Sequence, residues 1–194
     1  MSVWRISIGE LPPLPARPVV LRGTAFAITG WVEYEPTGVL AYRELFLSFA
    51  VRDGRHVSTT ITHMWVDSPE SRAGGRGLWA IPKELAEFTF GPDRTFEAHD
   101  ENGPLAAASF RRGRGLPLRV PTAFSVLQPD GEELRRSPVR ATAYAHLAGA
   151  DWRLGGSGPF AFLGEHRPWL SLAVRDFRMR FGQAPPGGVR EWRP

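Results

Sequence analysis

The sequence predicts a mainly β fold, an antiparallel barrel or sandwich with one or two short helices. Three observations indicate this class. Glycine and proline are frequent, with 21 and 18 among 194 residues, which favours many turns and argues against a helical bundle. Apolar and polar residues alternate with period two over several stretches, as they do in half-buried strands. A helical pattern covers one short segment only.

The strands are placed by this alternation. A long strand is expected over Val39–Val51, and Asp53-Gly54 is a strong turn signal, so Val57–Val66 is predicted to return as the second strand of a hairpin. Further strands are predicted over Leu105–Arg111, Val139–His146 and Val174–Phe181.

The predicted helix is Pro82–Phe88, which has proline in its first turn and acidic residues near its start. The glycine-rich run Gly74–Gly77 completes no phosphate-binding pattern and is interpreted as a turn.

One domain is expected over residues 1–194, a length that suits a single hydrophobic core. Residues 1–18 are predicted to be a proline-rich arm, because the prolines of Leu11–Pro18 fix φ and remove backbone donors. Such an arm packs on its own domain or on a neighbouring subunit. Residues 184–194, rich in proline and glycine, are expected to form a loose tail.

Composition excludes several classes of function. The chain has no cysteine, which removes disulfides, thiolate nucleophiles and cysteine-ligated metals, and its five histidines lack zinc-site spacing, so no metal and no cofactor is expected. The net charge is only +4 and acidic residues are spread throughout, which argues against nucleic acid as a partner. No apolar run approaches the roughly 20 residues of a membrane span, and the start lacks a signal-peptide layout. A cytoplasmic protein without a membrane partner is expected.

Lysine usage is the most informative count. Of the 24 basic residues, 23 are arginine and one is lysine, Lys83. A compositional bias towards arginine explains why lysine is rare, but it does not explain the position of the remaining one. Lysine can act as a neutral amine nucleophile when its surroundings disfavour the ammonium, whereas arginine stays protonated.

Gly75-Arg76 is followed, after a few mostly apolar residues, by Pro82-Lys83. This arrangement resembles the signature of the acetoacetate decarboxylase-like proteins, which is Gly-Arg-Glu, a few apolar residues and then Pro-Lys. The resemblance covers approximately Thr37 to Phe181. Three further segments support it: Tyr42-Arg43-Glu44 as the family's Tyr-x-Glu, Met64-Trp65-Val66-Asp67, and Trp152 with Gly158-Pro159-Phe160.

This resemblance implies an antiparallel β-barrel, a homo-oligomer, and a Schiff base between Lys83 and a small keto acid. It also implies that Glu44 transfers protons or holds the lysine. Arg76 is a candidate for binding the substrate carboxylate, and the alternative is that it braces the loop. The remaining candidates are expected to line the substrate pocket: Trp79, Trp65 and His63. For Trp65 and His63 a place in the core is the alternative.

A Schiff base begins with a neutral amine, and a free lysine, with a pKa of about 10.4, is almost fully protonated at pH 7. The site must therefore disfavour the charge. Burial among Leu78, Trp79 and Ile81 is expected to do most of this, and a helix starting at Pro82 would add a smaller dipole effect.

The sequence also departs from the family pattern. Gly77 replaces the glutamate of Gly-Arg-Glu, Glu84 stands where the decarboxylase has a second lysine, and the N-terminal region is shorter. The leading prediction is a Schiff-base lyase that decarboxylates a small keto acid. Two alternatives stay open: an aldolase or dehydratase that uses the same lysine imine, and a non-catalytic barrel that binds a small molecule.

Overall fold

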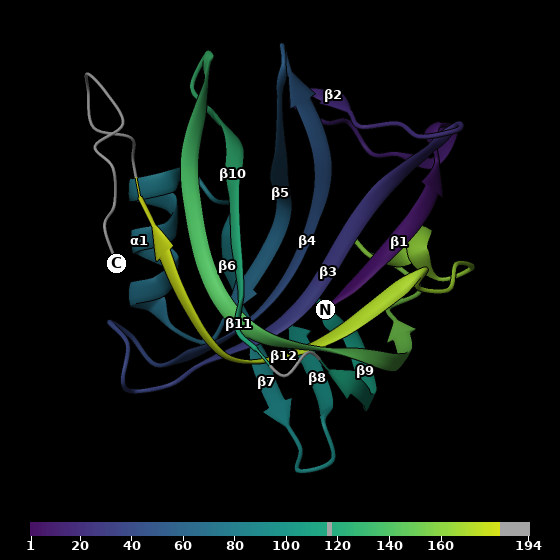
Figure 1. Cartoon of the computed structure of the whole chain (residues 1–194), viewed down its shortest axis with the longest axis vertical. Helices are drawn as coiled ribbons and strands as arrows, with labels where there is room; N and C mark the ends of the chain where they lie inside the picture. Colours follow the sequence, from purple (N-terminus) through teal and green to yellow (C-terminus); the bar gives the residue numbers. More distant parts are fainter. Residues whose placement is uncertain (116–117, 183–194) are drawn as a thin grey trace.

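The computed structural model describes residues 1–115 and 118–182, which form a sheet of long, curved strands (Figure 1). The predicted tail at 184–194 lies outside the described residues. The strands are β1 Ser2–Ser7, β2 Arg17–Pro18, β3 Thr24–Tyr34, β4 Tyr42–Asp53, β5 His56–Val66, β6 Lys83–Leu85, β7 Glu87–Phe90, β8 Thr95–Asp100, β9 Gly103–Gly115, β10 Val120–Asp130, β11 Glu133–Leu154 and β12 Leu170–Phe181. The α-helix α1 spans Pro69–Trp79, and short 3-10 helices span Ile8–Glu10 and Ala161–Leu163.

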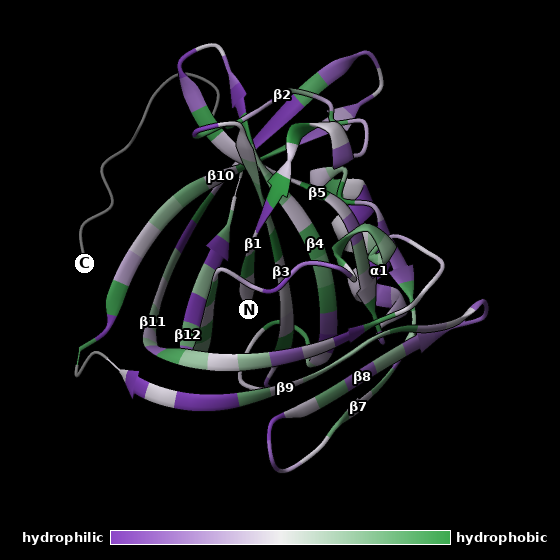
Figure 2. Cartoon of the chain, turned by 90° about the vertical axis from the view of Figure 1, so that its right-hand side faces the viewer, coloured by the Kyte–Doolittle hydropathy of each residue, from purple (hydrophilic) through white to green (hydrophobic). Residues whose placement is uncertain are grey.

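The sheet closes on itself. Its order runs β10-β5-β4-β3-β1-β12-β11, and β10 also pairs with β11, so these strands form a circuit. The 22-residue β11 is long enough to pair with β10 and β12 in its first part and with β9 in its second, and Figure 2 shows it curving between them. Strands β9, β8 and β7 continue the sheet beyond the circuit. The mainly β class is confirmed, although β5 pairs in parallel with β6 and β10.

The predicted hairpin around Asp53-Gly54 forms as β4 and β5, with Gly54 at the positive φ of 57° that such a turn requires. The two faces of β4 enter different apolar clusters. On one face lie four fully buried residues: Leu45, Leu47, Phe49 and Val51. On the other lie Glu44 and Phe46.

Two clusters of buried side chains result. The first cluster joins β1, β3, β4 and β5 to β8 and β9, and includes Trp4, Leu45, Trp65 and Leu105. The second cluster lies on the opposite face of β4 and β5. Its buried members are Ile61, Met64, Val66, Ile81, Val126 and Val139, against which Tyr42, Phe46, Trp79 and Phe181 pack.

The N-terminal arm is only partly as predicted. Ser2–Ser7 is not an arm but strand β1, which pairs with β3 and β12 and buries Trp4 and Ile6. The proline-rich segment behind it packs on its own domain, with Leu11 and Leu14 against the first cluster. A short period-two pattern at the start of the chain was the signal for this strand.

The helix predicted over Pro82–Phe88 does not form there, and this prediction is wrong. Residues 83–85 form β6 and residues 87–90 form β7, whereas α1 contains the glycine run that was interpreted as a turn. Ser68 is the N-cap and accepts a hydrogen bond from the Ser71 backbone N–H at 3.1 Å, and Pro69 occupies the first turn. Each glycine in a helix costs about 1 kcal/mol of helix stability relative to alanine. The Ser68 cap and the packing of α1 therefore outweigh the low helix propensity of its glycines.

Within residues 1–115 and 118–182, no helix combines the length and the apolar character that a bilayer crossing requires.

Candidate active site

Lys83 is buried at the start of β6, with 4% of its surface exposed. It lies opposite Met64 of β5 in the parallel pairing, so its side chain shares the face of the second cluster. The expected apolar surroundings are present in Ile81 and Trp79, but Leu78 is exposed and takes no part.

The amine of Lys83 has three polar partners. Nζ donates to Ser71 Oγ at 2.9 Å, to Glu44 Oε2 at 3.1 Å and to the Tyr42 hydroxyl at 3.4 Å. Nζ also lies 4.9 Å from the centre of the Tyr42 ring. Strand β4, helix α1 and strand β6 therefore bring together one amine, one carboxyl and two hydroxyls in a buried place. Ser71 was not predicted, because nothing in the sequence pattern links this serine to the lysine.

Glu44 is the buried carboxyl of this site, with 4% of its surface exposed. Burial raises its pKa, while the charge of Lys83 and hydrogen bonds from Lys83, Tyr42 and Tyr34 act in the opposite direction. A carboxyl group with a raised pKa holds a proton more readily than a surface glutamate does. Glu44 is thus suited to exchange protons with its neighbour, which is the role expected for it from the sequence.

Two tyrosines flank Glu44. Tyr34 and Tyr42 lie directly opposite each other on β3 and β4, and their rings stack with centres 4.3 Å apart. Burial, followed by the charge of Glu44, raises the pKa of both phenols, that of Tyr34 well above its ordinary value. Both are therefore neutral hydrogen-bond donors near pH 7. Tyr34 was missed because its role depends on the register between β3 and β4.

Helix α1 packs directly on the lysine side chain. A Cβ atom on Gly75 would stand 2.6 Å from Lys83 Cδ, so this position accepts only glycine without a shift. Arg76, expected to bind the substrate carboxylate or to brace the loop, donates from Nε to the Lys83 carbonyl at 2.7 Å and pairs with the Glu84 carboxylate. Glu84 is exposed and lies on the opposite face of β6 from Lys83, as strand alternation requires. In this arrangement Arg76 braces β6.

The three predicted pocket residues lie on two different sides of β5. Trp79 of α1 is on the side of Lys83, and Trp65 and His63 of β5 are on the other. Trp79 packs on the second cluster, its ring 4.7 Å from that of Phe181. Trp65 and His63 point the other way, opposite Leu45 and Leu47. Their rings stack at 5.7 Å, and burial lowers the pKa of His63. Because successive strand residues alternate faces and Met64 faces Lys83, the assignment of Trp65 and His63 to this site is corrected.

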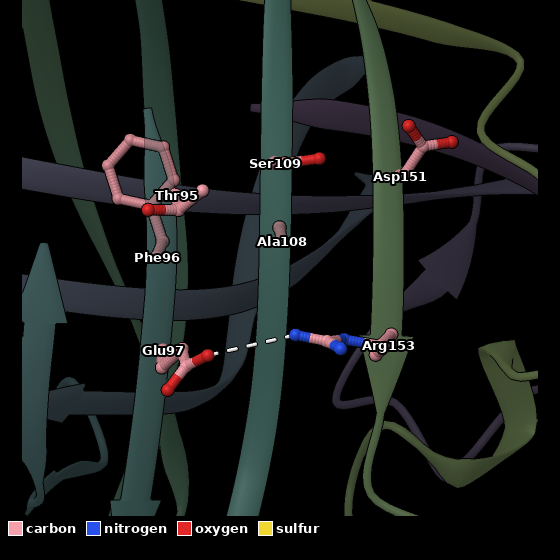
Figure 3. A pocket seen from close by; sticks show the side chains of 7 residues that line it. All are labelled: Thr95, Phe96, Glu97, Ala108, Ser109, Asp151 and Arg153. Carbon is pink, nitrogen blue, oxygen red and sulfur yellow. Dashed lines mark ion pairs between the residues drawn. The ribbon is translucent and has the colours of Figure 1, made fainter. Parts of the chain in front are cut away.

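Other candidate sites lack comparable chemistry. In the described part of the chain, no three histidine or acidic side chains gather closely enough to hold a metal ion. A surface pocket of about 480 Å³ lies over β8, β9 and β11, where Glu97 and Arg153 pair across small residues of β9 (Figure 3). Both charged side chains are largely exposed, and the pocket contains none of the residues around Lys83.

Comparisons with solved structures show where this fold occurs. Acetoacetate decarboxylase from Legionella pneumophila superposes with a TM-score of 0.64 at 16% identity, over 94% of this chain and 80% of that one. An acetoacetate decarboxylase-like enzyme from Sphingomonas wittichii RW1 gives 0.61 at 16% identity, over 94% and 87%. The enduracididine biosynthesis enzyme MppR, complexed with pyruvate, gives 0.55 at 15% identity, over 92% and 86%.

A search of curated proteins found no match. The family model described as acetoacetate decarboxylase (ADC) matches residues 13–119, more than half of the 194 residues. The matched region includes β4, α1 and β6, the elements that supply Glu44, Ser71 and Lys83. On this match, the chain belongs to the acetoacetate decarboxylase family.

Proposed function

We propose that this protein is an enzyme that forms a Schiff base between Lys83 and a small keto acid and releases CO2 from it. The observation that supports the proposal best is the placement of the single lysine of the sequence. Its amine is buried and lies 3.1 Å from a buried carboxyl, among apolar side chains. A buried amine that served stability alone would be replaced at little cost by an apolar residue.

The first step needs a neutral amine, and Glu44 is the group that takes the proton. Its raised pKa reduces the difference in proton affinity between carboxyl and amine. The neutral amine forms a C–N bond with the ketone carbon, and the electron pair of the C=O bond moves to oxygen. Glu44 passes its proton to this oxygen and then carries a second proton to it from the nitrogen, so the oxygen leaves as water and the protonated imine remains.

The protonated imine is an electron sink. In a β-keto acid, the pair of the bond to the carboxylate moves towards the imine nitrogen, CO2 leaves, and an enamine forms. Proton addition at the enamine carbon and hydrolysis of the imine release the ketone and restore the amine. The proton carriers in contact with the amine are the Glu44 carboxyl and the hydroxyls of Ser71 and Tyr42.

A second candidate is an aldolase or dehydratase on the same imine. The position of the second lysine in the decarboxylase is Glu84 here, and this residue faces away from the site. The amine is therefore surrounded by a carboxyl and hydroxyls instead of a second ammonium. A carboxylate beside an imine suits removal of an α-proton, the step that aldol and dehydration reactions share.

Reductive trapping tests the proposal. The protein is incubated with acetoacetate or with pyruvate, reduced with borohydride, and measured by intact mass and peptide mapping. We expect a mass gain on the peptide that contains Lys83, and no gain there in Lys83→Arg, which keeps the charge but cannot form an imine. Release of CO2 with acetoacetate identifies a decarboxylase, whereas trapping without CO2 identifies the second candidate. Absence of a Lys83 adduct with either acid would leave a non-catalytic binder.

A further inference from the structure

Strand β12 contains an extra residue beside the second cluster. Tyr144 of β11 pairs with Arg175, but Thr142 pairs with Arg178, so two residues of β12, Asp176 and Phe177, stand against one of β11. Asp176 has a φ of 50°, in the left-handed region that non-glycine residues seldom adopt. Bulges of this kind bend a strand and redirect a side chain, and they occur often beside active sites.

A small cluster of side chains contacts the bulge and its partner strand. Arg119 donates from its guanidinium to the Asp176 carbonyl, and the same guanidinium lies 4.9 Å from the centre of the Tyr144 ring. The guanidinium of Arg175 lies 5.6 Å from the same ring. These contacts connect Arg119, the residue before β10, with β11 and β12 at the bulge, so they favour the strained backbone over a regular strand.

The redirected side chain is Phe177. Its half-buried ring meets Tyr34 edge to face, with centres 5.4 Å apart and planes at 77°. Tyr34 stacks on Tyr42, and the Tyr42 ring lies 4.9 Å from Lys83 Nζ. Phe177, Tyr34 and Tyr42 thus form a continuous row of rings, which we term the aromatic row, that ends at the amine.

The aromatic row is held at both ends. Tyr42 and Tyr34 bond through their hydroxyls to Glu44, which fixes them near the amine. Phe177 covers Tyr34 from β12 and is fixed by the bulge. The rings of the aromatic row therefore have little freedom to move aside. They restrict any substituent on the imine carbon that extends from Lys83 along the row.

We propose that Phe177 is a specificity-determining residue of the Lys83 site, set in place by the β12 bulge. It limits the size of the substituent on the substrate carbonyl to a small alkyl group. This inference rests on the proposed function, because it concerns the substrate of the same imine. Removal of the Phe177 ring opens space beside Tyr34 while leaving Lys83, Glu44, Ser71 and Tyr42 unchanged.

The test compares small and large 2-oxo acids. Rates of borohydride trapping are measured with pyruvate and with phenylpyruvate for the wild type, Phe177→Ala and Phe177→Leu. We expect the rate ratio of phenylpyruvate to pyruvate to rise by tenfold or more in Phe177→Ala, and by less in Phe177→Leu, because a hydrophobic pocket discriminates size by factors of roughly 10 to 200. The rate with pyruvate itself should change less than the ratio does.

The matched control is Phe26→Ala. Phe26 is also half-buried and meets one aromatic ring, that of Trp169 at 6.2 Å, but it lies near the other end of β3, about 26 Å from Tyr34 at roughly 3.3 Å per residue. The ratio of the phenylpyruvate to the pyruvate trapping rate in Phe26→Ala should equal that of the wild type. A positioning role for Arg119 predicts that Arg119→Gln raises the ratio by a smaller factor than Phe177→Ala does.

The outcomes separate the two proposals. If the wild type is trapped and folded Phe177→Ala keeps the wild-type ratio, the specificity role of Phe177 is overturned while the Schiff-base function stands. If the wild type forms no Lys83 adduct with either acid, the proposed function fails first. If Phe177→Ala does not fold by circular dichroism, Phe177→Leu decides, and an unchanged ratio there overturns the inference.

Discussion

The pair of Lys83 and Glu44 is the residue-scale feature on which the proposed chemistry depends. Taking each charge out of water costs several kcal/mol, and mutual attraction together with hydrogen bonds from neighbouring groups offsets this only in part. Both side chains are nevertheless about 95% buried, at 5% and 6% exposure. Because apolar residues would serve the core as well, the pair is better explained by reactivity than by stability.

Stability measurements on this pair test that view. We expect Glu44→Gln to lose about 3–5 kcal/mol, because it leaves a buried ammonium without its counter-charge. Lys83→Met should lose less, since burial already raises the pKa of Glu44 and the unpaired carboxyl can take up a proton. The double variant Glu44→Leu with Lys83→Met should be at least as stable as the wild type.

Urea unfolding at pH 7 measures these differences. A loss below about 1 kcal/mol in Glu44→Gln would mean that water reaches the pair and that it resembles a surface ion pair.

Helix α1 is the element that positions the lysine. It touches Lys83 at three places: Ser71 Oγ meets the amine, Gly75 lies against the methylene carbons, and Arg76 binds the backbone carbonyl. Ser71 and Gly75 are four residues apart and therefore lie on one face of the helix. The glycine that weakens the helix is thus the residue that lets it approach β6.

Alanine substitutions in the glycine run separate the cost of glycine to helix stability from its role in letting the helix approach Lys83. Gly75→Ala places a Cβ atom 2.6 and 2.7 Å from Lys83 Cδ and Cε, so we expect a stability loss of about 1–3 kcal/mol. Trapping at Lys83 should fall by roughly tenfold to a hundredfold, because displacement of the amine disturbs the reacting geometry.

Gly77→Ala is the control within the same helix. A Cβ atom at Gly77 meets no atom within 4 Å, so this variant should gain up to about 1 kcal/mol from helix propensity and keep its trapping rate. Thermal unfolding and borohydride trapping report both quantities, and equal behaviour of the two variants would contradict the packing role of Gly75.

At the scale of the whole molecule, the circuit of strands depends on the seam between β5 and β10. Backbone pairing there is confined to Val126 and Thr59. Side chains complete the seam: Gln128 is fully buried, its Oε1 accepts from the Ile61 N–H at 3.2 Å, and its Nε2 donates to the Ile61 carbonyl at 2.9 Å. Gln128 therefore replaces the missing backbone pairs and keeps β5, with Met64 beneath Lys83, in place.

Gln128→Leu should consequently destabilise the protein by about 2–4 kcal/mol, because it leaves the N–H and carbonyl of Ile61 buried without partners. Hydrogen exchange should show faster opening of β5 and β10 than of β3 and β4. Thr122→Val, at an exposed position of β10, should stay within about 0.5 kcal/mol of the wild type. Uniform exchange across all strands in Gln128→Leu would argue against a local seam.

The sequence by itself determined the mainly β class and the β4–β5 hairpin, and it selected Lys83 and Glu44 as candidate site residues. Period-two alternation, an Asp-Gly turn and a family motif are local signals, and each can be detected within a short stretch of chain. The same local rules misplaced the helix, because at Pro82–Phe88 they found proline and acids at a helix start and at Gly74–Gly77 they found turn residues. The signal that begins α1, Ser68 followed by proline, is also local, but the glycines behind it outweigh it in a prediction from propensity.

Only the tertiary structure decided which side chains surround the amine. Ser71, Tyr34 and Phe177 reach the site through helix packing, strand register and a bulge, which depend on pairings between distant segments. The same dependence moved Trp65 and His63 to the opposite face, since one residue along a strand reverses the direction of a side chain. Local patterns indicate which residues can react, whereas long-range pairing fixes their neighbours.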